Sequence, residues 1–139
     1  MNYTVPSGLS VTLVAQSIIA AGALWLSVAG IVAVISPEAA RRFIGRMGST
    51  PRIHFTEHFL RGLVGVALIL AAASSKFPAA FHGAGIFIAA TSLLILIAPR
   101  EWHARYSRTA ARKLGDGTLR ALGPISFAAG VGLLWAVRA

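Results

Sequence analysis

The amino-acid sequence predicts an all-α protein built as a bundle of four transmembrane helices. Hydrophobic residues make up 56% of its 139 residues and charged residues only 12%, whereas soluble domains carry about 25% charged residues. The apolar residues form four long stretches, each near the roughly 20 residues that cross a hydrocarbon core of about 30 Å. A soluble chain of this size lacks the volume to bury four such helices. The stretches are residues 11–35, 59–75, 79–98 and 119–137.

Each stretch has the composition of a membrane span. Residues 11–35 and 79–98 contain no charged side chain, so both can lie entirely in hydrocarbon. The other two carry Arg61 and Arg120 close to their starts, where a long arginine side chain reaches the headgroups. Small residues in these two stretches, such as Gly65, predict close helix packing.

The connecting segments also contain helix signals. Ser36 and Pro37 favour a helix start, since proline at the first helical position loses no hydrogen bond, and Gly48 should end that helix. Thr50 and Pro51 predict a second start that leads into the second span. The later connection places apolar residues four apart, which predicts a helix with one apolar face that ends before residues 115–117. These residues are Trp102, Tyr106, Ala110 and Leu114.

Charge predicts the orientation in the membrane. All but Lys76 and Arg138 of the 13 basic residues lie in the two longer connections or at the adjoining ends of the spans. The positive-inside rule then places both basic loops in the cytoplasm and both termini outside. The same rule accounts for the net charge of +9, so we expect no nucleic-acid partner.

The chain is expected to form one integral membrane domain, residues 1–139, made of two similar hairpins at about 11–77 and 79–138. In each half, an apolar span ends at Pro37 or Pro99, a basic segment follows, and a Leu-Arg pair opens the next span. Because each unit has two spans, the tandem hairpins would have parallel orientation.

The second half carries Ile97-Ala98-Pro99-Arg100-Glu101-Trp102, then Leu119-Arg120-Ala121-Leu122-Gly123, then a Gly-rich apolar end that includes Trp135. Over residues 90–138 it resembles the YjeT-like family of small bacterial inner-membrane proteins, which are two-span hairpins without an assigned activity. This resemblance implies a multi-pass protein of the bacterial inner membrane and transfers no active site. The chain departs from the family in its additional first hairpin and in Arg100, where the family tends to have an acid.

One motif suggests metal chemistry. His54, Glu57 and His58 spell H-x-x-E-H, in which two histidines four apart on a helix can share a metal ion beside a glutamate base. A third protein ligand would have to be Glu101 or His103. The alternative is an ion pair of Glu57 with Arg61, one helical turn later. We favour the ion pair, and therefore expect no cofactor.

The leading functional hypothesis is a non-enzymatic accessory or scaffold protein. Its spans would bind partner helices, as a homo-oligomer or as a subunit of a larger membrane complex, and its basic loops would bind anionic lipid headgroups. The expected headgroup contacts are Arg41, Arg42, Arg105, Arg108 and Arg112, with Trp102 and Tyr106 as interface anchors. Two alternatives stay open: a small transporter or channel subunit, although the polar residues deep in the spans are mostly hydroxyls, and a metal-dependent enzyme at the inner face.

Overall fold

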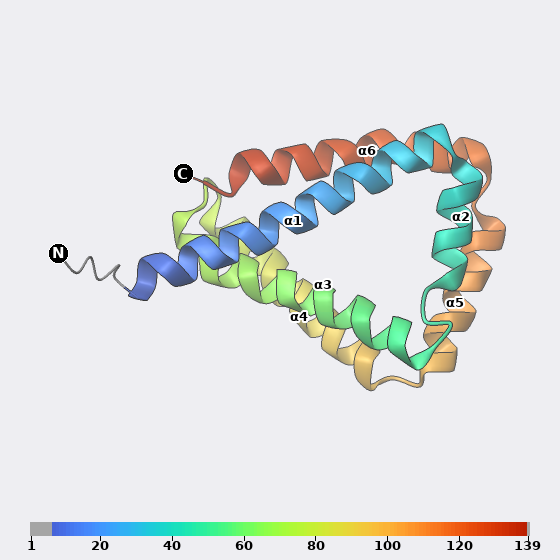
Figure 1. Cartoon of the computed structure of the whole chain (residues 1–139), viewed down its shortest axis with the longest axis horizontal. Coiled ribbons are helices and arrows are strands. Elements are labelled where there is room, and N and C mark those ends of the chain that lie inside the picture. The colour runs from blue at the N-terminus through green and yellow to red at the C-terminus, as the bar shows by residue number, and fades with distance from the viewer. Residues whose placement is uncertain (1–6, 139) are drawn as a thin grey trace.

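The protein is a set of long helices joined by two shorter ones (Figure 1). The computed structural model describes residues 7–138, apart from the side chains of Ser7 and Leu9. In this part of the chain every regular element is helical, which confirms the predicted all-α class. The elements are α1 (Ser7–Ile35), α2 (Pro37–Arg46), α3 (Pro51–Ala71), the 3₁₀ turn η1 (Ala72–Ser74), α4 (Pro78–Ile97), α5 (Arg100–Lys113) and α6 (Asp116–Ala136).

Four of these helices are long and apolar enough to cross a membrane: α1, α3 with η1, α4 and α6. The prediction of a multi-pass membrane protein is confirmed at that level. The second spanning helix begins at Pro51, where Thr50 and Pro51 predicted a helix start, and continues into the apolar stretch without a break. The Thr50 hydroxyl accepts the backbone N–H of Ile53 at 3.2 Å. The H-x-x-E-H motif therefore lies on the spanning helix itself.

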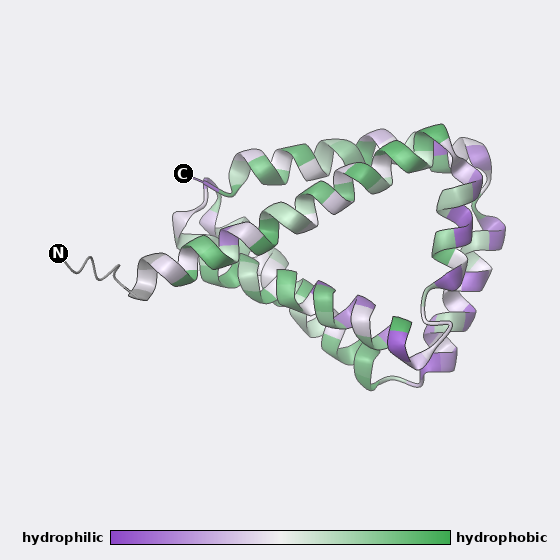
Figure 2. Cartoon of the chain, in the orientation of Figure 1, coloured by the Kyte–Doolittle hydropathy of each residue, from purple (hydrophilic) through white to green (hydrophobic). Residues whose placement is uncertain are grey.

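The long helices pack as two pairs, α1 with α6 and α3 with α4. The pairs contact each other through α1 and α3 near the end of the molecule that holds the start of α1 and the end of α6, and they diverge toward the other end (Figure 1). There α2 and α5 lie side by side and connect the diverging pairs. Figure 2 shows that hydrophilic residues are concentrated on α2 and α5, whereas the long helices are mainly hydrophobic.

Small residues set the distance within each pair. A Cβ atom added at Gly30 of α1 would lie 2.5 Å from the carbonyl oxygen of Gly123 in α6. One added at Gly65 of α3 would lie 2.6 Å from the backbone nitrogen of Ala89 in α4. Backbone contact of this kind drives helix association in lipid, where helices gain little from the hydrophobic effect.

Polar contacts join the two pairs at the end that holds the start of α1 and the end of α6. The Gln16 side-chain amide on α1 donates to the Ser74 hydroxyl at 3.4 Å and to the carbonyl oxygen of Val137 at 3.3 Å. The backbone N–H of Lys76 donates to Ala136 at 3.0 Å. The two pairs are thus fastened together at this end, and the connection at the opposite end depends on α2 and α5.

Candidate metal centre

Three histidines meet where the beginning of α3 lies against α5. His54 and His58 are one turn apart on α3 and are 6% and 5% exposed. His103 reaches them from the first turns of α5, and its ring centroid lies 5.6 Å from that of His54 and 4.7 Å from that of His58. One ligand nitrogen from each ring lies within 4.8 Å of the other two. We call His54, His58 and His103 the histidine cluster.

The buried nitrogens of this cluster lack hydrogen-bond partners. Both ring nitrogens of His54, both of His58 and Nε2 of His103 are buried and unbonded among the described residues. Buried polar atoms are normally paired, and each unsatisfied one costs about 1–3 kcal/mol. A metal ion bound between the rings would take one lone pair from each histidine.

The surroundings favour the neutral form of His103. Burial, followed by the neighbouring His54 and Arg61, lowers the pKa of His103 below its ordinary value. Only the neutral imidazole can coordinate a metal ion. The environment that disfavours the protonated ring therefore preserves the lone pair that a ligand must offer.

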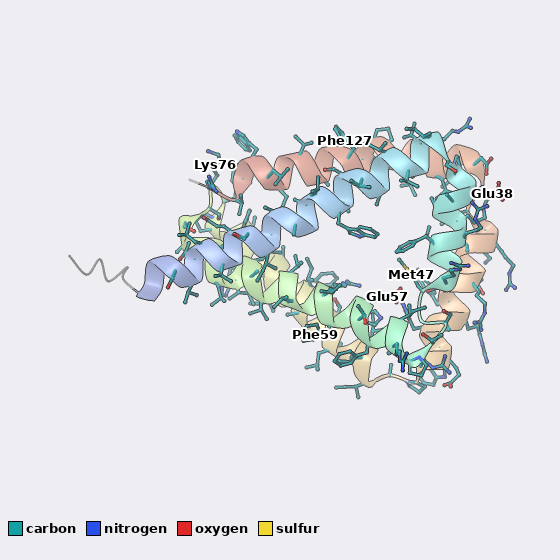
Figure 3. All side chains as sticks on the ribbon, in the orientation of Figure 1. Glu38, Met47, Glu57, Phe59, Lys76 and Phe127 are labelled. Carbon is teal, nitrogen blue, oxygen red and sulfur yellow. The ribbon has the colours of Figure 1, made fainter. Side chains whose placement is uncertain are left out.

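Glu57 lies on α3, between His54 and His58 in the sequence and near the beginning of the helix (Figure 3). Its Oε2 accepts the backbone N–H of Gly48 at 3.1 Å and is 3.7 Å from Nε2 of His103. The predicted ion pair of Glu57 with Arg61 is wrong, because the Arg61 guanidinium points to α4 and donates to the Thr91 hydroxyl at 3.1 Å. The turn between α2 and α3 draws the carboxylate toward His103 instead.

That turn is fitted closely around His103. Gly48 has a φ of 67°, a conformation that favours glycine. A Cβ at this position would lie 2.7 Å from Cδ2 of the His103 ring. Arg100 donates to the carbonyl oxygen of Ser49 at 2.9 Å and so fastens the same turn to α5. Three segments thus surround the cluster: the start of α3, the start of α5 and the α2–α3 turn.

The other end of the α2–α5 pair is joined by an ion pair. Arg41 of α2 pairs with Asp116 at the start of α6 and donates through Nε to the carbonyl oxygen of Leu114 at 3.1 Å. Arg41 follows Pro37 by four residues, as His103 follows Pro99. Comparable positions of the two connecting helices therefore hold an arginine in an ion pair in one case and a histidine in the cluster in the other.

The remaining predicted site residues are not brought together. Arg41 binds Asp116 and the carbonyl oxygen of Leu114, and Arg42 pairs with Glu38 on its own helix. Arg105, Arg108 and Arg112 are exposed. Trp102 and Tyr106 are 68% and 73% exposed, because α5 buries a different face. That buried face consists of Ala104, Ser107 and Ala111.

Of the two candidate third ligands, His103 joins the motif, whereas Glu101 is exposed and lies 3.6 Å from Arg100. Two grooves along α1 lie elsewhere and are lined mainly by apolar side chains. No protein-family model, curated protein or solved structure matches the chain. The resemblance to the YjeT-like family therefore stays a prediction.

Proposed function

We propose that the protein is an integral membrane metalloprotein that binds one divalent transition-metal ion, Zn²⁺ in the first instance, at His54, His58 and His103. The observation that carries this proposal is the convergence of three buried imidazoles whose nitrogens lack hydrogen-bond partners. Coordination would turn one unsatisfied nitrogen of each ring into a ligand.

The donor set determines the class of ion. Imidazole nitrogens suit zinc, copper, iron and nickel, whereas magnesium and calcium require mostly oxygen ligands. The chain has no cysteine, so thiolate sites for zinc or iron–sulfur clusters are excluded. Three histidines with a carboxylate at hand match the ligands of zinc, which binds nitrogen at about 2.0–2.1 Å in tetrahedral geometry.

The site would lie at the cytoplasmic face of the inner membrane. The basic residues are concentrated at the end of the molecule formed by α2 and α5, and the positive-inside rule assigns that end to the cytoplasm. In this arrangement the chain is two tandem hairpins in parallel orientation, α1–α3 and α4–α6. Exchanging the two hairpins exchanges the α1–α6 and α3–α4 contacts, which supports duplication.

The proposal is tested by the metal content of the protein purified in detergent with a histidine-free affinity tag. After exposure to Zn²⁺ and removal of weakly bound ions, we expect one zinc per chain in the wild type. His58→Ala and His103→Ala should each lose it. His82→Ala is the matched control, because His82 is exposed and lies on α4, outside the cluster. Zinc retained by both cluster variants, or absent from the wild type, would refute the proposal.

A second candidate function, lipid binding by a scaffold protein, is favoured by the exposed basic and aromatic side chains of α5. Lys and Arg near an anionic leaflet contribute about 1 kcal/mol each. Replacing Arg105, Arg108 and Arg112 with Gln should reduce retention of anionic lipid, as measured by native mass spectrometry. Replacing Lys76 and Arg138, outside the basic loops, is the control. Equal retention in both variants would exclude this role.

A further inference from the structure

The metal site raises the question of its fourth ligand, which decides whether the ion could act on a substrate. A structural zinc is coordinated by four protein ligands, whereas a catalytic zinc keeps one position for water. The histidine cluster supplies three. The inference that follows rests on the proposed metal binding.

Glu57 is placed to supply the fourth. Two ligands of a tetrahedral zinc ion lie about 3.3–3.4 Å apart, from bond lengths of about 2.0–2.1 Å. The Glu57 Oε2 atom is 3.7 Å from Nε2 of His103, close to that separation. The ligand atoms within 4.8 Å of one another are those of the three histidines, so the Glu57 side chain would have to turn toward His54 and His58 to join them. Along α3, His54 precedes Glu57 by three residues and His58 follows it directly. The Gly48 N–H that binds this carboxylate resembles the hydrogen bonds that orient metal-bound carboxylates elsewhere.

The site is also shielded. His54 and His58 are almost fully buried, and the side chains of His103 and Glu57 are 17% and 23% exposed. The α2–α3 turn covers His103 so closely that Gly48 has no room for a Cβ. These features match a metal ion enclosed by protein better than a metal ion that a substrate can reach.

We propose that Glu57 completes a closed three-histidine, one-carboxylate site, in which the ion clamps α3 to α5 and does not catalyse a reaction. Through the Gly48 hydrogen bond the clamp extends to the α2–α3 turn. It then joins the α3–α4 pair to the connecting helices, as the Arg41–Asp116 ion pair joins the α1–α6 pair to them.

The test is the visible spectrum of the protein loaded with Co²⁺, which replaces zinc and reports its coordination. We expect the intense absorption of four-coordinate Co²⁺ in the wild type, unchanged when azide is added, because no position is free. Glu57→Gln should still bind Co²⁺ through the histidines, at least tenfold more weakly, since even loss of an outer-shell partner costs 10–100-fold. Its spectrum should change with azide. Glu101→Gln, in an exposed acid of α5, should behave like the wild type.

A wild-type spectrum that responds to azide would show an open position and overturn the closed site. So would a Glu57→Gln variant with the affinity and spectrum of the wild type. Both results presuppose bound metal, so they are distinct from failure of the proposed function, in which the wild type takes up no ion.

The clamp itself is measured with spin labels. The chain has no cysteine, so Phe55→Cys and Tyr106→Cys, at exposed positions of α3 and α5, introduce the only two labelling sites. Zn²⁺ should narrow the distance distribution between the labels, and Glu57→Gln should reduce that narrowing. A distribution unaffected by Zn²⁺ in metal-loaded protein would contradict a clamp.

Discussion

Replacing Gly65 with alanine should separate α3 from α4 and destabilise the protein. The added Cβ would lie 2.6 Å from the backbone nitrogen of Ala89 and 3.0 Å from the carbonyl oxygen of Gly85. Both neighbours are backbone atoms, which cannot rotate away as a side chain could. The helices must therefore move apart until these distances approach ordinary van der Waals contact, and every other contact along the pair weakens with them.

The expected loss follows from two opposing terms. Overpacking a well-packed contact costs about 1–3 kcal/mol. Alanine offsets up to about 1 kcal/mol of this through its greater helix propensity. We therefore expect the free energy of unfolding to fall by up to about 2 kcal/mol. Gly132→Ala is the control, because a Cβ at Gly132 has no atom within 4 Å, and it should be neutral or slightly stabilising.

Unfolding by increasing fractions of a denaturing detergent in mixed micelles, followed by circular dichroism, gives both free energies under one condition. A Gly65→Ala variant as stable as Gly132→Ala would show that α3 and α4 do not make this close contact. The reasoning about small residues at the helix interfaces would then fail for this pair.

Three further results are expected. Zn²⁺ at 100 times its dissociation constant should stabilise the wild type by about 2.7 kcal/mol, measured as a higher melting temperature in detergent. His103→Ala should lose most of that stabilisation. An equal stabilisation of both proteins would contradict coordination by His103. Arg41→Gln should destabilise the protein by about 1–2 kcal/mol, as expected for lost hydrogen bonds to a charged group. Arg42→Gln, in an exposed pair within one helix, should cost about 0.5 kcal/mol or less. Chemical denaturation measures both losses, and equal losses would refute the proposal that Arg41 joins α2 to the start of α6. Alkaline phosphatase fused to the C-terminus should be active, because the enzyme folds only outside the cytoplasm, and an inactive fusion that accumulates normally would reverse the predicted orientation.

Features that depend on neighbouring residues could be read from the sequence. The apolar stretches mark the spans because their signal is summed over about 20 residues. Pro37 and Pro51 mark helix starts because proline acts on its own turn. The pairing of α1 with α6 could not be derived in this way, because it depends on which small surfaces meet. Gly30 and Gly123 face each other only in the folded protein.

The candidate site likewise combines features that the sequence predicts with features that depend on how the helices pack. The spacing of His54 and His58 placed both on one face of a helix, and the sequence left His103 and Glu101 as alternatives for a third ligand. Only the packing of α5 beside α2 selects His103. The expected Glu57–Arg61 pair failed for a related reason, since spacing alone does not reveal that the turn at Gly48 offers its N–H to the carboxylate.

A difference in burial separates the two ends of the α2–α5 pair, and it favours an ion pair at one end and the proposed histidine site at the other. The side chains of Arg41 and Asp116 are 31% and 60% exposed, so water solvates their charges and an ion pair can form without severe desolvation. His54 and His58 are nearly inaccessible, and two opposite charges there would face a desolvation penalty of several kcal/mol per ion. The ring nitrogens of His54 and His58 have no hydrogen-bond partner among the described residues, so hydrogen bonds between the rings do not hold this end together. In the proposed site a coordinated ion would give one nitrogen of each ring a partner, and structural zinc contributes about 10–16 kcal/mol of apparent binding energy in small peptides.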